Sequence, residues 1–381
     1  MLGFARMGPQ EGRAAMSETR FPGHFPRPFA FRSFRRFPGG FPGRPPFVAG
    51  LFVLILAPGG ALALAETAPL SDCDRLAGFR ALPRLPDAPG VYAIRYPDAA
   101  VAACEEARRA SPGDPFLSVL LARARVAAKP EDSSVLELLD TATEALPALV
   151  AAEIGRLYET GRAGLPTGDR QARGFYRQAC DLAPEPLSRP GCTRLGVMMI
   201  EGRGGPTDLE TGFRLLGALC GEGWGAACTQ LAFQTDLRGI GDFDTLPERI
   251  AALFEAGCAA GDLLGCSQLG FRLELGDGVA HDPARAQALY RDACDGGEPQ
   301  GCSYLGEIYR SGLGVPPDMV EATRLFAMGC DGNDPYACVT LGDILSDGRG
   351  VPVDLPRALS VLEHACWLGD PEGCDKADDL R

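Results

Sequence analysis

The sequence predicts an all-α protein, specifically an α/α solenoid in which helical hairpins stack in a row. Three observations carry this prediction: a 36-residue period, a constant spacing within pairs of cysteines, and glycines that recur at the same places. The first members of four pairs, Cys258, Cys294, Cys330 and Cys366, lie 36 residues apart, and each is followed by a second cysteine eight residues later. A repeat of this length cannot bury its apolar face alone, so its copies must stack on one another.

Each repeat is predicted to form a helix, a glycine turn and a second helix. The copy that begins at Cys302 reads CSYLGEIYRSGLGVPPDMVEATRLFAMGC, and Leu305 and Tyr309 share one face of its first helix. A glycine follows Leu305, and because glycine is an unfavourable helix residue, we expect a neighbouring backbone to approach closely there. The G-x-G-V motif then ends the helix, and an aspartate, such as Asp282 or Asp354 in other copies, caps the second helix.

Earlier copies of the repeat are less regular. The copy that begins at Cys228 is two residues longer and has Ala232 where the helix glycine is expected, and the first copy has Ala151 in place of a cysteine. We predict about six repeats over residues 147–381. Residues 66–146 lack the motif but show helical periodicity, which predicts an N-terminal helical cap of tetratricopeptide-like hairpins.

The first 65 residues have the order of a secretory signal peptide. Residues 1–46 hold eight arginines, two glutamates and neither aspartate nor lysine. An apolar core too short to span a bilayer follows, and the segment ends in Ala-Leu-Ala. We predict a signal peptide over 1–65, with Met7 or Met16 as alternative start sites; an uncleaved membrane anchor is the alternative interpretation.

The charge of the remaining chain limits its partners. Removing 1–65 takes away +6 (eight Arg minus two Glu), so the formal net charge becomes −13 − 6 = −19. Such a body repels nucleic acid and anionic membranes and attracts basic surfaces. We expect a protein or peptide partner with basic character, no nucleic acid, no stable membrane insertion after cleavage, and a monomer.

The fourteen cysteines indicate a disulfide framework. All of them follow residue 65, and an even number in an exported chain is typical of cross-linking. Zinc sites favour shorter spacings with histidine support, whereas only His281 and His364 follow residue 65, and no C-x-x-C redox motif is present. We therefore expect no metal and no cofactor. Cys302 could pair with Cys294 or with Cys330, and the two loop entropies differ by only about 1 kcal/mol, which does not decide between them.

The pattern C-x3-G-x5-G-x-G-V-x2-D-x3-A-x7-C resembles Sel1-like repeats, specifically the disulfide-rich Helicobacter cysteine-rich protein family. The resemblance covers about residues 147–378. It implies the short pairing, in which each bridge joins one repeat to the next, and the constant spacing of eight agrees with it. Cys180 and Cys192 take the same position with a longer loop, and one pair remains at the N-terminal end. The implied disulfides are Cys73–Cys104, Cys180–Cys192, Cys220–Cys228, Cys258–Cys266, Cys294–Cys302, Cys330–Cys338 and Cys366–Cys374.

The resemblance also raises an enzymatic alternative, because members of that family have been described as penicillin-binding or β-lactamase-like. A serine enzyme of this type needs S-x-x-K. The chain has only Lys129 and Lys376, with Val126 and Gly373 three residues before them. We therefore expect no catalytic residues. The predicted function is an exported, disulfide-stapled scaffold, periplasmic or secreted, that binds a protein or peptide; a cell-wall hydrolase or an assembly factor of an oxidising compartment are the alternatives.

The binding residues are expected on the first helix of each repeat, because solenoids present a concave groove lined by these helices. Positions two, five and eight after each cysteine point away from the apolar face, although a merely solvated face would show the same pattern. Tyr304 is the best single anchor, since tyrosine is enriched at binding hot spots. The candidate residues are Arg194, Gln268, Tyr304, Glu307, Arg310, Asp343 and Ser346.

Overall fold

The structure is a computed structural model, and it describes residues 71–78, 94, 96–182, 186–241 and 245–381. All of these belong to one compact unit, Thr67–Arg381. The signal peptide predicted for 1–65 and its alternative start sites lie outside the described residues.

The described residues are all-helical and contain no strand, as predicted. Four helices precede the repeats: α1 (Asp72–Ala77), α2 (Pro97–Ala110), α3 (Pro115–Ala128) and α4 (Val135–Ala142). The first helices of the repeats are α5 (Pro147–Thr160), α7 (Arg189–Glu201), α9 (Gly225–Arg238), α11 (Leu263–Leu275), α13 (Pro299–Ser311) and α15 (Pro335–Asp347). The second helices are α6 (Asp169–Asp181), α8 (Leu209–Gly221), α10 (Leu246–Ala259), α12 (Pro283–Asp295), α14 (Met319–Asp331) and α16 (Leu355–Trp367), and α17 (Pro371–Asp379) follows the last pair.

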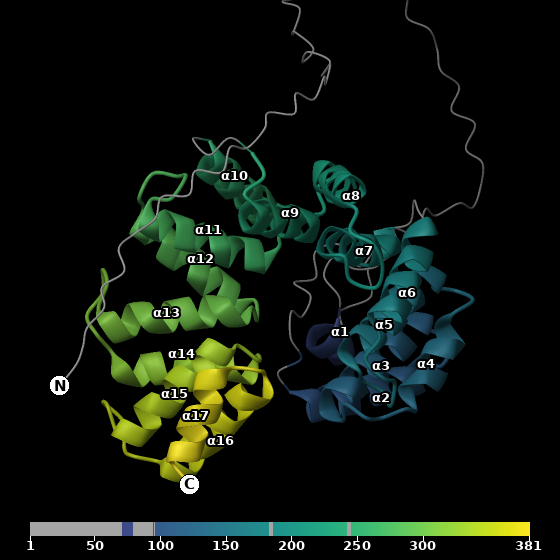
Figure 1. Cartoon of the computed structure of the whole chain (residues 1–381). Coiled ribbons are helices and arrows are strands. Elements are labelled where there is room, and N and C mark those ends of the chain that lie inside the picture. Colours follow the sequence, from purple (N-terminus) through teal and green to yellow (C-terminus); the bar gives the residue numbers. More distant parts are fainter. Residues whose placement is uncertain (1–70, 79–93, 95, 183–185, 242–244) are drawn as a thin grey trace, which may run out of the picture. The chain divides into compact units, whose positions relative to one another are not determined.

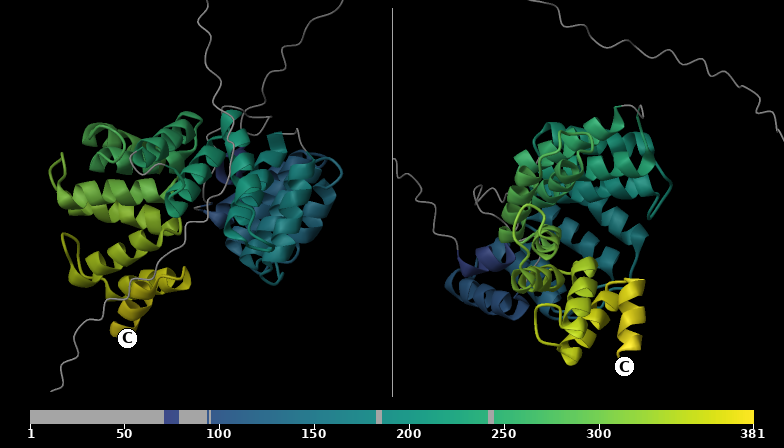
Figure 2. Two further views of the ribbon diagram at one scale, coloured as in Figure 1. Left: turned by 45° about the horizontal axis from the view of Figure 1, so that its top comes forward. Right: turned by 90° about the vertical axis from the view of Figure 1, so that its left-hand side faces the viewer.

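The helices stack in chain order, so the fold is an α/α solenoid. From α7 onward, each first helix packs against the second helix of its own repeat and against the second helix of the preceding repeat. The first helices α11, α13 and α15 lie beside one another (Figures 1 and 2). The large buried side chains come from the contacts between successive helices, such as Tyr176 on α6 and Phe326 on α14. Stacking of neighbours therefore builds the core that a single hairpin cannot form.

The glycine turns and caps form where the sequence predicts them. Gly276 and Gly312 end α11 and α13 in the left-handed region, with φ of 70° and 76°, which glycine adopts without steric cost. Asp282 and Asp354 cap the second helices that follow, since each carboxylate accepts a backbone N–H bond, of 3.0 and 3.1 Å.

The glycine inside the first helix makes room mainly for a side chain of the second helix. The expected backbone approach is found in the early copies, where a Cβ atom would lie 3.3 Å from a backbone carbonyl oxygen at Gly155 and 3.4 Å from one at Gly196. A Cβ atom on Gly270 would lie 2.6 Å from the ring of Tyr290, and one on Gly306 would lie 3.2 Å from the ring of Phe326. Both rings are fully buried and belong to the second helix of the same repeat, four residues before its last cysteine. The ring is seated directly on the first helix at this point.

All fourteen cysteines are paired, in the seven bridges that the family resemblance implies. Cys294–Cys302, for example, joins the end of α12 to the start of α13 over a Cα–Cα distance of 4.5 Å. Cys73–Cys104 joins α1 to α2. The bridges within the solenoid thus link each second helix to the first helix of the next repeat.

A second inter-repeat link is buried beside the disulfides. Ser267 on α11 donates a hydrogen bond of 2.5 Å to Glu298, the N-cap of α13, and Ser303 on α13 bonds Asp334, the N-cap of α15, in the same way. Glu298 is 1% exposed, and its carboxylate also accepts the N–H of Gly301. Burial raises the pKa of Glu298, although these hydrogen bonds act in the opposite direction.

Candidate functional site: a pocket on the first helices

A pocket of ≈ 440 Å³ lies where α11, α13 and α15 run side by side. All three are first helices of their repeats, so the pocket opens on the face that the sequence nominates for binding. Its walls combine aromatic rings, carboxylates and amides, and none of the eight lining residues carries a positive charge. The lining residues are Phe271, Glu274, Gln300, Ser303, Tyr304, Glu307, Asp334 and Tyr336.

Aromatic rings form the apolar part of the pocket. Phe271 stacks on Tyr304 with ring centroids 5.6 Å apart and planes inclined by 18°, and Tyr304 also contacts the buried ring of Tyr290 at 5.0 Å. Phe271 is 38% exposed and Tyr336 is 48% exposed, on α11 and α15 respectively. These rings are rigid and partly open to solvent, as aromatic anchor sites at interfaces are.

Three carboxylates form the polar part. Glu274 accepts a 2.9 Å hydrogen bond from the Tyr290 hydroxyl, and Glu307 accepts one of 3.2 Å from Tyr336. Burial, followed by the charge of Glu274, raises the pKa of Tyr290, so its hydroxyl keeps its proton and remains a donor. Asp334 is 9% exposed and accepts from Ser303, and burial raises its pKa. The pocket therefore concentrates negative charge beside aromatic surface.

Four of the seven predicted binding residues gather at this pocket. Tyr304 and Glu307 line it. Gln268 donates a 2.8 Å hydrogen bond to the lining residue Gln300. Arg310 does not line the pocket but donates to both carboxylate oxygens of the lining residue Glu307, at 2.8 and 2.7 Å.

The other three predicted residues lie elsewhere. Asp343 pairs with Lys376 at 2.7 Å, one repeat further on, and Ser346 donates to the backbone carbonyl of Asp343 at 3.1 Å. Arg194 lies on α7 and pairs with Glu159 on α5. Arg194 and Asp343 link neighbouring helices, Ser346 bonds within α15, and none of the three lines the pocket.

Sequence reasoning did not single out Phe271, Glu274, Gln300 or Tyr336. Phe271 and Glu274 follow Cys266 by five and eight residues, so the same rule that selected Gln268 would have found them. Gln300 and Tyr336 precede their cysteines by two residues. Because α13 begins at Pro299, its exposed stripe starts at Gln300, one turn before Tyr304, and a rule counted from the cysteine onward misses this first turn.

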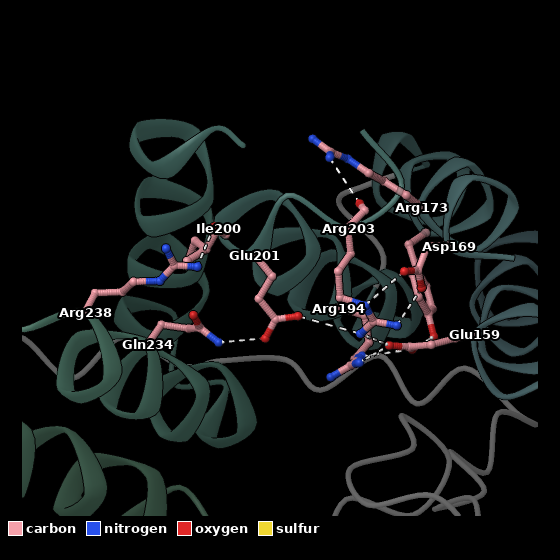
Figure 3. Close-up of polar contacts among 10 residues, drawn as sticks. Glu159, Asp169, Arg173, Arg194, Ile200, Glu201, Arg203, Gln234 and Arg238 are labelled. Atoms are coloured by element: carbon pink, nitrogen blue, oxygen red, sulfur yellow. Dashed lines mark hydrogen bonds and ion pairs between the residues drawn. The ribbon is translucent and has the colours of Figure 1, made fainter. Parts of the chain in front are cut away.

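The corresponding place in the first repeats is filled by arginines (Figure 3). Glu159 on α5 accepts hydrogen bonds from Tyr176 at 2.7 Å, from Arg203 at 2.8 Å and from Arg194. Arg203 also pairs with Asp169 at 2.6 Å. Burial alone would raise the pKa of Glu159, but the bonds and charges of Arg194, Tyr176 and Arg203 hold it below its ordinary value.

Two further properties concern the described part of the chain only. It contains no group of three or more histidine, cysteine or acidic side chains arranged to hold a metal ion. None of its helices combines the length and the apolar composition that crossing a bilayer requires.

The segments that match a known protein family correspond to the helix pairs of the repeats. The model of the Sel1 repeat family matches residues 148–184, 190–220, 263–298, 299–334 and 335–360. The irregular copy with Ala232 lies between the second and third matches. No curated protein matches the chain.

Similar solved structures include three bacterial proteins. One is a protective antigen of uropathogenic Escherichia coli that displays an SLR fold, with 21% identity, a TM-score of 0.43 and coverage of 74% of this chain and 59% of that one. A Sel1 repeat protein from Oxalobacter formigenes shows 19% identity, a TM-score of 0.47 and coverage of 65% and 96%. A putative Sel1 repeat protein from Klebsiella pneumoniae shows 24% identity, a TM-score of 0.38 and coverage of 55% and 98%. The chain thus spans less than two thirds of the E. coli protein.

Proposed function

We propose that this chain, which carries Sel1 repeats between residues 148 and 360, is an exported scaffold that binds a protein or peptide on the face of its first helices. It does so in an oxidising compartment, the bacterial periplasm or the extracellular space. The role is recognition and not chemistry: the chain holds a partner on a rigid surface.

The pocket between α11, α13 and α15 is the observation that carries this proposal. It joins exposed aromatic rings, Phe271 and Tyr336, to carboxylates and amides within one hollow of ≈ 440 Å³. Aromatic side chains held in place beside polar groups are the usual anchors of protein recognition. The bridges Cys294–Cys302 and Cys330–Cys338 fix the helices that carry the lining residues, which lowers the entropy lost on binding.

The location and the partner's charge rest on separate observations. Seven disulfides indicate an oxidising environment, and the leader over 1–65 supports export with cleavage before Glu66. The net charge of −19 expected after cleavage favours a basic partner over nucleic acid or an anionic membrane.

The proposal is tested by selecting peptides from a displayed random library on the oxidised chain. Their affinities for the native chain are then compared with those for Tyr304→Ala and for Trp367→Ala, whose ring is 63% exposed on the second helix α16. Because Tyr304 lines the pocket and its ring contacts both Phe271 and Tyr290, we expect Tyr304→Ala to weaken binding by roughly thirtyfold, as for a hot-spot residue, and Trp367→Ala to change it little.

Unchanged binding to Tyr304→Ala, with thermal unfolding close to that of the native chain, would place recognition elsewhere. Turnover of nitrocefin by the oxidised chain above that of a cysteine-free control would contradict a purely binding role.

A further inference from the structure

We propose that the pocket between α11, α13 and α15 receives the guanidinium group of an arginine side chain that belongs to the bound protein or peptide. The inference rests on the proposed function and adds the chemistry of the anchor residue. It comes from comparing copies of one site within the same chain.

Three of the six copies carry a carboxylate at the same place in the repeat, at Glu159, Asp236 and Glu274. Glu274 follows Cys266 by eight residues, and Glu159 follows Ala151, which stands at the cysteine position, by the same number. Each of these two glutamates accepts a hydrogen bond from the tyrosine that lies four residues before the next cysteine. This tyrosine is Tyr290 for Glu274 and Tyr176 for Glu159. The two sites are therefore built alike up to this point.

In the two other copies that carry this carboxylate, the chain itself supplies an arginine to it. Glu159 is bound by Arg194 of the next first helix and by Arg203 of the turn that follows it. Asp236 on α9, eight residues after Cys228, is bound by Arg272 of the next first helix at 2.5 Å. A guanidinium from a neighbouring repeat thus fits against this position in two independent places.

At Glu274 the internal arginine is missing. The residue equivalent to Arg194, two after the cysteine of the next repeat, is Tyr304, and the residue equivalent to Arg203 is Leu313. Within the described residues no arginine or lysine pairs with Glu274, and the pocket opens in front of it. The carboxylate, its tyrosine donor and the space are present, while the cation of the other copies is not.

The surroundings of Glu274 favour arginine over lysine. A guanidinium can stack on the partly exposed ring of Phe271 or Tyr336 and donate its N–H groups to the carboxylates of the pocket, whereas an ammonium group offers no plane to stack and loses more hydration. Arg310, which does not line the pocket, pairs with Glu307, so the pocket keeps a net negative charge with Glu274 and Asp334. The charge of the pocket is thus complementary to an arginine of a partner.

The first test uses blocked peptides with a single central arginine, flanked by glycine and serine, and the same peptides with citrulline or lysine. Citrulline keeps the shape of arginine but has no charge. Binding to the oxidised chain is followed by NMR titration. We expect the arginine peptide to shift resonances of α11, α13 and α15, and to bind about tenfold or more tightly than the citrulline peptide, because a charge-assisted bond is lost.

The second test uses variants of the chain. Glu274→Gln removes the charge, and Tyr304→Arg supplies the internal guanidinium found at Arg194, so both should reduce binding of the arginine peptide about tenfold or more. Glu321→Gln is the matched control, because Glu321 pairs with Arg324 on α14 as Glu307 pairs with Arg310, but it lies outside the pocket. It should leave the affinity unchanged.

Equal affinity for arginine and citrulline peptides, or binding that Glu274→Gln and Tyr304→Arg leave intact, would overturn the inference. Tighter binding of the lysine peptide than of the arginine peptide would also overturn it. So would tighter binding of a free guanidinium salt than of the arginine peptide at equal concentration. If library-selected peptides bind the pocket without arginine, the scaffold function survives and only the arginine anchor fails.

Discussion

At the scale of single residues, the repeat depends on a glycine that has no room for a side chain. Gly270 lies under the ring of Tyr290, and a Cβ atom there would be 2.6 Å from ring carbon Cε1. The hydroxyl group of Tyr290 in turn donates a hydrogen bond to Glu274 in the pocket. A change at this glycine would therefore disturb both the core of the repeat and the orientation of the candidate site.

We expect Gly270→Ala to destabilise the chain by about 1–3 kcal/mol, since the buried ring of Tyr290 must move to admit the methyl group. Gly174→Ala, within α6 but with open space where the Cβ would lie, should stabilise by about 0.5–1 kcal/mol through helix propensity. Denaturant unfolding of both variants measures the two effects. A destabilisation of the same size at Gly174 would mean that helix packing is not the reason for the glycine.

At the scale of helices, neighbouring first helices are tied together through the N-cap carboxylates. Glu298 caps α13 and accepts the hydroxyl bond of Ser267 on α11, so a single buried side chain both starts one helix and binds the other. Its pKa in the folded chain is raised by burial. The folded chain therefore binds this proton more tightly than the unfolded chain does, whose glutamates titrate near 4.3.

The contribution of Glu298 to stability should fall as the pH rises from about 4.3 through its folded pKa, because over this range the folded state holds more protons. Glu298→Gln cannot titrate, so we expect the stability of the variant minus that of the native chain to increase with pH over this window. Urea unfolding at several pH values measures this difference.

Glu321→Gln provides a control of opposite sign. The hydrogen bond from Arg324 lowers the pKa of Glu321, so its contribution is present above the unfolded value and is lost as the pH falls. The variant-minus-native difference should therefore decrease, by a small amount, as the pH rises. The same sign for both variants would show that the pH dependence does not come from Glu298.

At the scale of the whole molecule, cross-links connect only neighbours along the chain. Five of the seven bridges, such as Cys294–Cys302, join cysteines eight residues apart and link two successive helices. A solenoid gathers its stability from each repeat and its interface with the next, so losing one bridge should act locally.

Replacing Cys294 and Cys302 together by alanine should cost about 2–3 kcal/mol by loop entropy. Hydrogen exchange should show lost protection centred on α12 and α13 and unchanged protection in α2 and α3, which lie at the other end of the chain order. Peptide mapping of the native chain should recover Cys294 linked to Cys302. Recovery of Cys302 linked to Cys330, or a uniform loss of protection, would refute this local organisation.

Much of the fold could be predicted from the sequence because it depends on local and periodic features. The helix–turn–helix unit follows from the 36-residue period, and the turns and caps follow from residues such as Gly312 and Asp282, whose effects act within a few residues. Tyr304 and Glu307 could be placed on the exposed face because one helix period fixes the direction of both side chains.

The remaining features depend on which side chains of different helices meet, and only the tertiary structure decides that. The contact of the Tyr290 ring with Gly270, the bond from Ser267 to Glu298 and the bond from Tyr290 to Glu274 each join residues 16 to 31 positions apart. No local pattern marks these partners, because their contacts depend on how one helix is seated on the next. The same packing places arginines of the chain against Glu159, whereas at Glu274 it leaves a pocket.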